Sequence, residues 1–325
     1  MKWIKRVCLV LAVLVLGVFG LVFGKRVSAK VATPDLKVES NPTRLARGLY
    51  LFQSVATCGF CHTTGSVTKG QPSTTMFLGG DAFDHPILGR FLAPNITPDK
   101  ETGIGNWTDG EIYKALKYGQ RPNGDMLFPA MPYAQYRQMS DEDLYSIIAY
   151  IKTVPPVKHA VPERMFKMPF SALLWGYIMY PKAMKEPVAA INASDPVSRG
   201  RYIAMAGHCR NCHMAEAGPD RPDEDRPWVG GFSFIGPWGK GVSANLTSCK
   251  ETGLGRYSDD DLKKILTSGV RPDGTALSPP MDGVIPYIST MTDEDRSDLI
   301  AFLRTIPAVK FQPEKCQVDP SWRKQ

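Results

Sequence analysis

Two short segments of this chain carry a pair of cysteines and a histidine at the same close spacing. Residues 58–62 have the sequence Cys-Gly-Phe-Cys-His, and residues 209–213 have the sequence Cys-Arg-Asn-Cys-His. Two thiols separated by two residues can add across the two vinyl groups of one porphyrin, and the adjacent histidine can ligate the iron. The spacing therefore predicts two sites of covalent haem c attachment. The residues that form them are Cys58, Cys61, His62, Cys209, Cys212 and His213.

Two other uses of cysteine pairs fit this sequence less well. Cys58 and Cys209 are 151 residues apart, much farther than the paired ligands of a zinc ribbon. A thioredoxin-like redox pair lies between a strand and a helix, and neither segment has that context. We therefore expect two haems rather than a structural zinc ion or a dithiol centre.

The two motifs belong to a longer internal repeat. The clearest further matches are Asn-[Ile/Leu]-Thr at 95–97 and 245–247, Arg-Pro-x-Gly at 121–124 and 271–274, and Asp-Glu-Asp at 141–143 and 293–295. The separation between matched residues drifts between 150 and 152, which indicates small loop insertions. The chain is thus predicted to contain one module twice, over residues 42–157 and 194–309, with a C-terminal tail that extends the second domain to residue 316.

Each module is predicted to be mainly helical, with long loops wrapped around a cofactor that supplies the missing apolar core. The expected helices cover about 44–57 and 196–207 before the motifs, begin at Thr108 and Ser258 in the middle, and begin at Ser140 and Thr292 at the end. Pro155 and Pro307 should stop the last helix of each module. No segment alternates polar and apolar residues in the manner of a strand.

A methionine is expected on the second face of each iron, because thioether sulfur binds haem iron and raises its potential. Met131 lies 69 residues after His62, and Met281 lies 68 residues after His213. Both methionines follow the repeated Arg-Pro-x-Gly segment at the same distance. The sequence therefore predicts His62 and Met131 as one ligand pair, and His213 and Met281 as the other.

Other ligand candidates are weaker. Met139 and Met291 also match between the modules, but they directly precede a helix and are expected in the core. Three histidines outside the motifs, His85, His159 and His208, have no repeated partner, and loop or surface roles are expected for them. His208 directly precedes the second motif and is expected on the proximal side or at the haem edge.

Four matched polar residues are candidate haem contacts. Arg121 and Arg271 have the guanidinium geometry that pairs with propionate carboxylates, and Trp107 and Tyr257 can donate to the same groups. The alternative is that these residues cap loops and fill the core. Asn95 and its match in the second module are expected to hold loop backbone.

The charge distribution indicates export rather than nucleic-acid binding. The formal net charge is +7, but the first 26 residues contain five of the 39 basic residues and no acidic one. Residues 7–24 that follow the basic start carry no charge, so residues 1–29 are predicted to be an export signal or an uncleaved membrane anchor. No basic tract suits nucleic acid. Haem attachment to such motifs in bacteria occurs outside the cytoplasmic membrane, which places the protein in the periplasm or on its membrane face.

Two features remain outside the modules' common plan. Cys249 and Cys316 are the cysteines left in the exported body, and a disulfide between them is predicted, the alternative being two separate thiols. The linker over residues 158–193 contains an apolar stretch at 169–181 that is too short to span a membrane. We expect an interdomain helix there, the alternative being a docking surface for a partner protein or the membrane interface.

The motifs together resemble those of a known family, the multihaem cytochrome c subunits of membrane-bound alcohol and aldehyde dehydrogenases. The resemblance covers both modules and the linker, and it is closest at Asn-Ile-Thr-Pro (95–98) and Pro-Ala-Met-Pro-Tyr (129–133). It implies tandem class-I cytochrome c folds, His/Met irons, and electron transfer from a periplasmic dehydrogenase to a quinone, a cytochrome or a terminal oxidase. The family has three haem motifs, whereas this chain has two, and residues 280–282 are Pro-Met-Asp where 130–132 are Ala-Met-Pro.

Two kinds of function follow from two haems. The first is an electron-transfer protein or subunit without chemistry of its own, with both irons six-coordinate. The alternative is a dihaem enzyme such as a peroxidase, which needs an open iron site with acid–base groups above it. The matched methionines favour the electron carrier.

Overall fold

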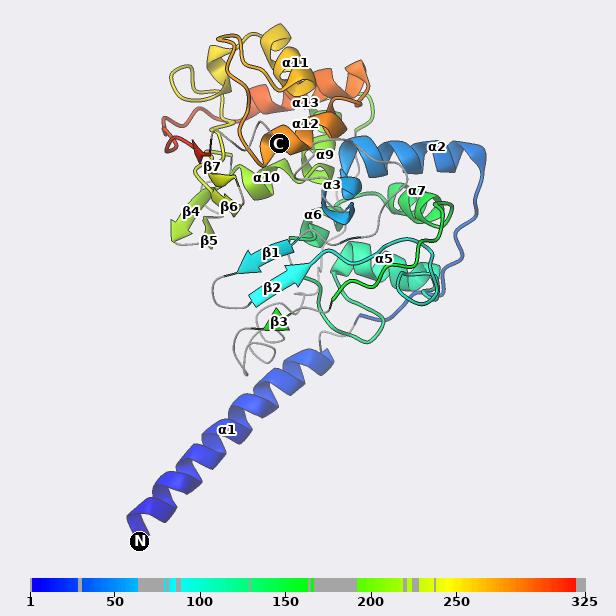
Figure 1. Cartoon of the computed structure of the whole chain (residues 1–325), viewed down its shortest axis with the longest axis vertical. Helices are drawn as coiled ribbons and strands as arrows, with labels where there is room; N and C mark the ends of the chain where they lie inside the picture. The colour runs from blue at the N-terminus through cyan, green and yellow to red at the C-terminus, as the bar shows by residue number, and fades with distance from the viewer. Residues whose placement is uncertain are drawn as a thin grey trace.

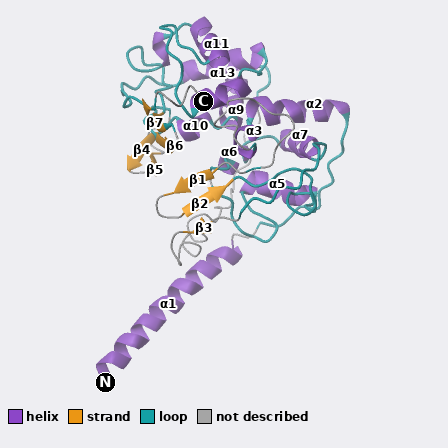
Figure 2. Ribbon diagram, in the orientation of Figure 1, coloured by secondary structure: helices purple, strands orange, loops and turns teal. Residues whose placement is uncertain are grey.

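Helices predominate in the computed structural model of this chain, and its strands are short (Figure 2). The structure describes residues 2–28, 31–63, 79, 82–85, 89–128, 130–162, 165–166, 192–218, 221–223, 228–236 and 238–319. The apolar stretch at 169–181 predicted to form an interdomain helix lies outside the described residues.

The first module is built from helices at the predicted positions. They are α2 (Pro42–Tyr50), the π-helix η1 (Leu51–Val55), α3 (Cys58–His62), α5 (Asp109–Tyr118), α6 (Tyr133–Tyr136) and α7 (Asp141–Ile151). Helix α5 begins with a reciprocal capping box, in which Thr108 and Glu111 satisfy each other's backbone N–H groups. The Ser140 side chain accepts the backbone N–H of Asp143 at the start of α7, whose acidic first turn complements the helix dipole.

The second module repeats this arrangement with different lengths. Its helices are α9 (Pro196–Ala206), α10 (Cys209–Cys212), the 3-10 turn η2 (Leu254–Arg256), α11 (Asp259–Ser268), α12 (Met281–Ile288) and α13 (Asp293–Thr305). Ser258 caps α11, and Thr292 caps α13. The last helices end before Pro155 and Pro307, so the predicted stops are confirmed.

Each module also contains a small antiparallel sheet, which the sequence did not predict. The first sheet joins β1 (Ala82–His85), β2 (Gly89–Leu92) and β3 (Met165–Phe166), and the second joins β6 (Ser233–Gly236), β7 (Gly239–Val242) and β8 (Gln317–Val318). A separate hairpin pairs β4 (Ala215–Gly218) with β5 (Arg221–Asp223). In both modules the third strand arrives from more than 70 residues later in the chain. Matched pairing of Gly89 with Phe166 and of Gly239 with Val318 therefore extends the repeat beyond its predicted ends.

The drift in the repeat is partly absorbed inside helices rather than in loops. Gly48 and Gly200 are 152 residues apart, whereas the first cysteines of the motifs are 151 apart. The extra residue of the first module falls within η1 (Leu51–Val55), a π-helical turn of the kind that a one-residue insertion produces. Helix α12 is in turn longer than its counterpart α6, which contributes to the return to 152.

The first and last helices of each module cross at a glycine. A Cβ added at Gly48 on α2 would overlap the carbonyl oxygen of Ser146 on α7, and one added at Gly200 on α9 would overlap that of Asp298 on α13. The backbones approach this closely only because both positions lack a side chain. This crossing is the common frame that holds each haem motif.

The two modules share one continuous hydrophobic core and are joined by crossed hydrogen bonds (Figure 1). Tyr50 on α2 donates to the carboxylate of Asp295 at the start of α13. Tyr202 on α9 donates to Asp143 Oδ2 at 2.6 Å at the start of α7, and it accepts the backbone N–H of Ser140 at 3.2 Å. Each module's first helix is thus bonded to the N-terminus of the other module's last helix.

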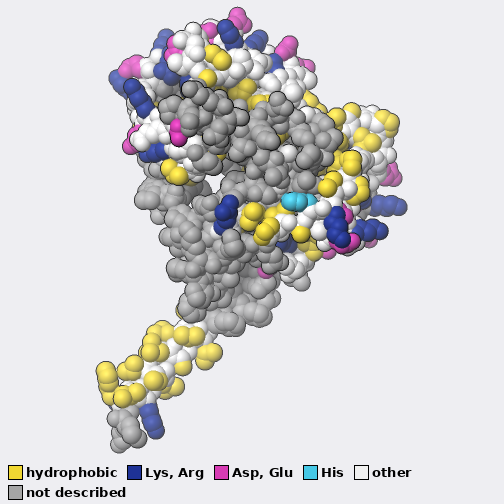
Figure 3. Space-filling model, in the orientation of Figure 1, with side chains coloured by type: hydrophobic (Ala, Val, Ile, Leu, Met, Phe, Trp, Pro, Cys, Tyr) yellow, Lys and Arg dark blue, Asp and Glu magenta, His cyan; other side chains and the backbone are white. Residues whose placement is uncertain are grey.

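Helix α1 (Lys2–Ser28) extends away from this body (Figure 1), with apolar side chains exposed along it (Figure 3). Among the described residues, no helix combines the length and the apolar character that crossing a bilayer requires. The predicted membrane anchor over residues 1–29 is therefore not supported.

The predicted disulfide between Cys249 and Cys316 is wrong for this structure, because both thiols are free. Cys249 Sγ accepts the hydroxyl of Thr252 at 3.4 Å within its own loop. Cys316 Sγ instead accepts the backbone N–H of Val242 at 3.2 Å, beside the sheet formed by β7 and β8. Spare cysteines in one domain give no information on which structural element each one packs against.

The crossed tyrosines should contribute measurably to the stability of the joined modules. Tyr202→Phe removes one hydrogen bond to a carboxylate and one from a backbone amide, and it should lower the free energy of unfolding by about 2 kcal/mol. Chemical denaturation of the haem-loaded protein measures this change. Tyr145→Phe, whose ring packs on Tyr113 inside the first module, is the control and should change stability by less than about 0.5 kcal/mol. Equal losses in both variants would contradict the assigned role of Tyr202.

Candidate haem sites

The first motif forms a short helix that directs both cysteines to one side. Cys58 and Cys61 are three residues apart on α3 (Cys58–His62), a spacing that puts side chains on the same helix face. Thr57, directly before α3, has the left-handed φ of 47°, which turns the chain sharply between η1 and α3. Burial raises the pKa of the Cys58 thiol to about 12, so this environment suits a neutral sulfur, as in a thioether.

The histidine that ends each motif is held by one hydrogen bond. His62 Nδ1 lies 2.8 Å from the carbonyl oxygen of Pro94, and His213 Nδ1 lies 2.8 Å from that of Ala244. A carbonyl can only accept, so Nδ1 carries the proton and Nε2 presents its lone pair. Burial lowers the pKa of both histidines, the carbonyls opposing this shift in part, which favours the neutral ring that a metal requires.

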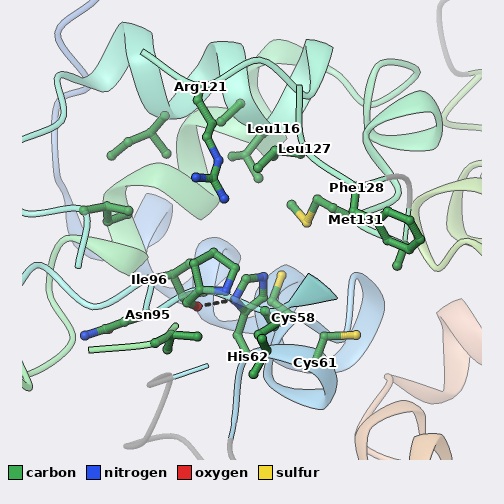
Figure 4. A pocket seen from close by; sticks show the side chains of 18 of the residues that line it. Cys58, Cys61, His62, Asn95, Ile96, Leu116, Arg121, Leu127, Phe128 and Met131 are labelled. Carbon is green, nitrogen blue, oxygen red and sulfur yellow. Dashed lines mark hydrogen bonds between the residues drawn. The ribbon is translucent and has the colours of Figure 1, made fainter. Parts of the chain in front are cut away.

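Above His62 lies a cavity of about 350 Å³, in the size range of cofactor sites. Its wall includes the cysteines of the motif, Trp107, Arg121 and Met131. Figure 4 shows the Met131 sulfur and the Arg121 guanidinium pointing into the cavity from the side opposite His62. The cysteine pair, the free imidazole nitrogen and the opposing thioether are the donor set that haem c requires, and they fit it.

The matched methionines occupy equivalent turns in the two modules. The backbone N–H of Met131 donates to Phe128 at 3.0 Å, and that of Met281 donates to Ser278 at 3.0 Å. Met131 directly precedes Pro132 and α6, and Met281 is the first residue of α12. Both side chains are half-buried, in contrast to Met139, which is 1% exposed in the core as predicted.

The two arginines predicted near haem differ in their surroundings. Arg121 lines the first cavity, as does Trp107. Arg271 Nη1 instead donates to the Ala276 carbonyl at 3.0 Å, which closes its own turn. Tyr257 packs against the guanidinium of Arg256, 4.9 Å from the ring centroid. The contacts in the second module match the loop-capping alternative, and a role toward propionates stays a prediction.

Two residues of the first cavity could not be assigned there from sequence. Met126 is 2% exposed and lines the cavity, but Ala276 stands at the matched position, so the repeat gives no signal. His208 lines the same cavity although it belongs to the second module. Its predicted place at a haem edge was inferred for the second site, and the structure brings it to the first.

The conserved-looking asparagines fix the loops that carry the accepting carbonyls, as predicted. Asn95 Nδ2 donates to the Val157 carbonyl at 2.8 Å, and its Oδ1 accepts the backbone N–H of Thr97 at 2.9 Å. Asn245 makes the matched bonds to Val309 at 2.9 Å and to Thr247 at 2.9 Å. Each asparagine thereby ties the loop next to the histidine's partner to the chain that leaves the last helix.

Residues 43–151 match the family model of the cytochrome C oxidase, cbb3-type, subunit III. This segment is a cytochrome c domain. The cytochrome domain contains the first cysteine pair, His62, the cavity and Met131, so the matched region and the first candidate site coincide. Proteins of this class carry covalently bound haem c.

The whole chain is similar to cytochrome subunits of dehydrogenases. It is 33% identical over 293 residues to the fructose dehydrogenase cytochrome subunit of Gluconobacter japonicus, covering 89% of this chain and 57% of that protein. It is 34% identical over 283 residues to the gluconate 2-dehydrogenase cytochrome c subunit of Pantoea cypripedii, covering 83% and 61%. A diheme cytochrome c-type protein of Cereibacter sphaeroides is 29% identical over 256 residues, covering 78% and 83%.

These similarities confirm the family resemblance inferred from the motifs. The chain spans only about three fifths of the length of the two dehydrogenase cytochrome subunits. It spans most of the diheme protein, whose name matches the number of haem motifs in this sequence.

Asn95 should be important to the stability of the first site. Asn95→Ala removes donors and acceptors that are buried on both sides of the loop, and it should cost about 3 kcal/mol of unfolding free energy. Thermal and chemical unfolding of the loaded protein measure this loss. Asn106→Ala is the matched control, because its side chain is exposed and donates only to the nearby Lys100 carbonyl, and it should cost less than about 1 kcal/mol. A similar small loss in both variants would show that Asn95 does not hold the loop.

Proposed function

We propose that this chain is a dihaem c-type cytochrome that relays single electrons and catalyses no reaction of its own. The observation that supports this most strongly is the matched geometry of two sites. Each site combines a cysteine pair, a histidine held through Nδ1, and a methionine in an equivalent turn. Haem c bound at such a site supplies a one-electron iron couple.

In this proposal the residues of each site have separate roles. Cys58 and Cys61 attach the first haem and Cys209 and Cys212 the second, so neither can dissociate. His62 and Met131 ligate one iron from opposite sides, and His213 and Met281 ligate the other. With both axial positions filled by protein, no substrate can bind the iron, and the ligands stay fixed while an electron arrives or leaves.

The surrounding protein suits electron transfer without proton chemistry. The carbonyls of Pro94 and Ala244 hold the imidazoles in one orientation, and apolar residues around the first cavity exclude water from the iron. Arg121 and Trp107 are placed to bind propionates. Arg271 and Tyr257 are proposed to do so in the second site, once the turn bond of Arg271 has been exchanged for a propionate.

The proposed path runs from a dehydrogenase to a later acceptor of the respiratory chain. Two relatives are named as cytochrome subunits of fructose and gluconate dehydrogenases, which supports a dehydrogenase as the electron donor. The acceptor is proposed to be a quinone, another cytochrome or a terminal oxidase. The basic, then uncharged N-terminal sequence supports export, and the proposed location is the periplasm.

Haem stoichiometry tests the first element of this proposal. The protein expressed with a c-type haem attachment system should carry two covalent haems by intact mass and by the pyridine haemochrome spectrum. Replacing Cys209 and Cys212 with alanine should leave one haem, held in the first module. Reduced protein should be low-spin and should not bind carbon monoxide readily. A high-spin iron that reacts with peroxide would overturn the carrier and support a peroxidase.

The ligand assignment makes a second prediction. Met131→Leu and Met281→Leu should each lower the potential of one haem, on the order of 0.1 V within the ~0.8 V that axial ligands control. Potentiometric titration followed at the haem bands measures both potentials in each variant. Met139→Leu is the control, because this buried methionine belongs to the core, and both potentials should stay unchanged. An unshifted pair of potentials in Met131→Leu would exclude Met131 as a ligand.

A further inference from the structure

The two haem motifs lie against each other at the boundary between the modules. Thr57 and His208 occupy matched positions, each directly before the first cysteine of its motif. Both have left-handed backbones, with φ of 47° and 45°. Thr57 Oγ1 and His208 Nε2 are 3.4 Å apart, so the residues that begin the two motifs are in direct contact.

The contact continues through the motifs in a crossed pattern. Phe60, inside the first motif, packs edge-on against Tyr287 of α12, with ring centroids 6.2 Å apart and planes at 81°. At the matched position of the second motif, Asn211 Nδ2 donates to Gln135 Oε1 of α6 at 3.2 Å. Helices α6 and α12 directly follow or contain the proposed methionine ligands. Each motif therefore touches the helix that is associated with the other site's methionine.

His208 is the residue through which the two sites are closest. Of the described residues that line the first cavity, His208 is the only one contributed by the second module. Its own peptide bond leads directly to Cys209, the first attachment point of the second site. Burial lowers the pKa of His208 to about 4, with partial opposition from the Ala56 carbonyl, so the ring is neutral at pH 7.

The backbone geometry supports a specific role for this contact. Threonine is β-branched, and a positive φ is rare and costly for such a residue. Thr57 nevertheless adopts φ 47°, and its hydroxyl is directed at the imidazole of His208. A strained residue of this kind persists only where its surroundings fix it, which here means the abutting motif of the other module.

We propose that His208 couples the two haem sites, and that an electron crosses between them where residues 56–60 meet residues 207–211. This inference rests on the dihaem carrier proposed above. One electron leaves a ferrous iron at one site, which becomes ferric, and reduces a ferric iron at the other. No proton or third reactant is needed. Tunnelling favours this path because the ring at the first cavity continues through covalent bonds to Cys209.

Rapid photoreduction of one haem per molecule tests this path in the full dihaem protein. His208→Asn keeps a residue that tolerates the left-handed backbone but removes the ring, and it should slow inter-haem transfer about tenfold or more. His159→Asn makes the same chemical change outside the contact and should leave the rate unchanged. The circular dichroism couplet of the two Soret bands, which depends on the relative orientation of the haems, should be the same in all three proteins.

The outcomes separate this inference from the proposed function. Fewer than two haems in the unaltered protein would overturn the carrier itself. Two haems with an unchanged rate in His208→Asn would overturn only the path. A slower rate together with a changed couplet would also overturn it, because His208 would then only hold the modules in place. If His208→Asn does not fold, Phe60→Leu should slow transfer with an unaltered couplet, and an unchanged rate there would refute the crossed contact.

Discussion

The hydrogen bond between each motif histidine and a loop carbonyl is the interaction on which the sites depend. The carbonyls belong to Pro94 and Ala244, which lie more than 30 residues after their histidines. Those carbonyls are useful acceptors only if the loops that carry them are rigid. Asn95 and Asn245 provide that rigidity by bonding each loop to the segment that follows the module's last helix. The orientation of one imidazole thus depends on nearly the full length of its module.

The modules are similar but are not independent. Their first and last helices cross at glycines within each module, and the tyrosine that follows each glycine by two residues bonds to the other module. The same helices therefore build the internal frame and the interface. A shared apolar core reinforces this arrangement, so that separating the halves would expose residues that are almost fully buried. Two electron-transfer sites consequently sit in one rigid body.

Much of this organisation could be predicted from residue types and spacing. The cysteine pairs, the matched methionines, the capping residues of the helices and the proline stops are local signals, and local chemistry determines them. The third strands β3 and β8 were missed because they pair with segments far away in sequence and are only two residues long. The place of His208 in the first cavity was missed for a related reason. The repeat describes each module separately, whereas His208 acts across the boundary.

The π-turn η1 has a consequence for how the two modules diverged. An added residue in a regular helix rotates everything beyond it by about 100°, which would direct the cysteines of the motif away from their cavity. Confining the residue to one widened turn keeps Tyr50 on one side and Cys58 on the other in the positions that their counterparts occupy. Helix α9 covers the same stretch with one residue fewer and no widened turn. The chain thus preserves, side by side, one helix with and without the same single-residue change in length.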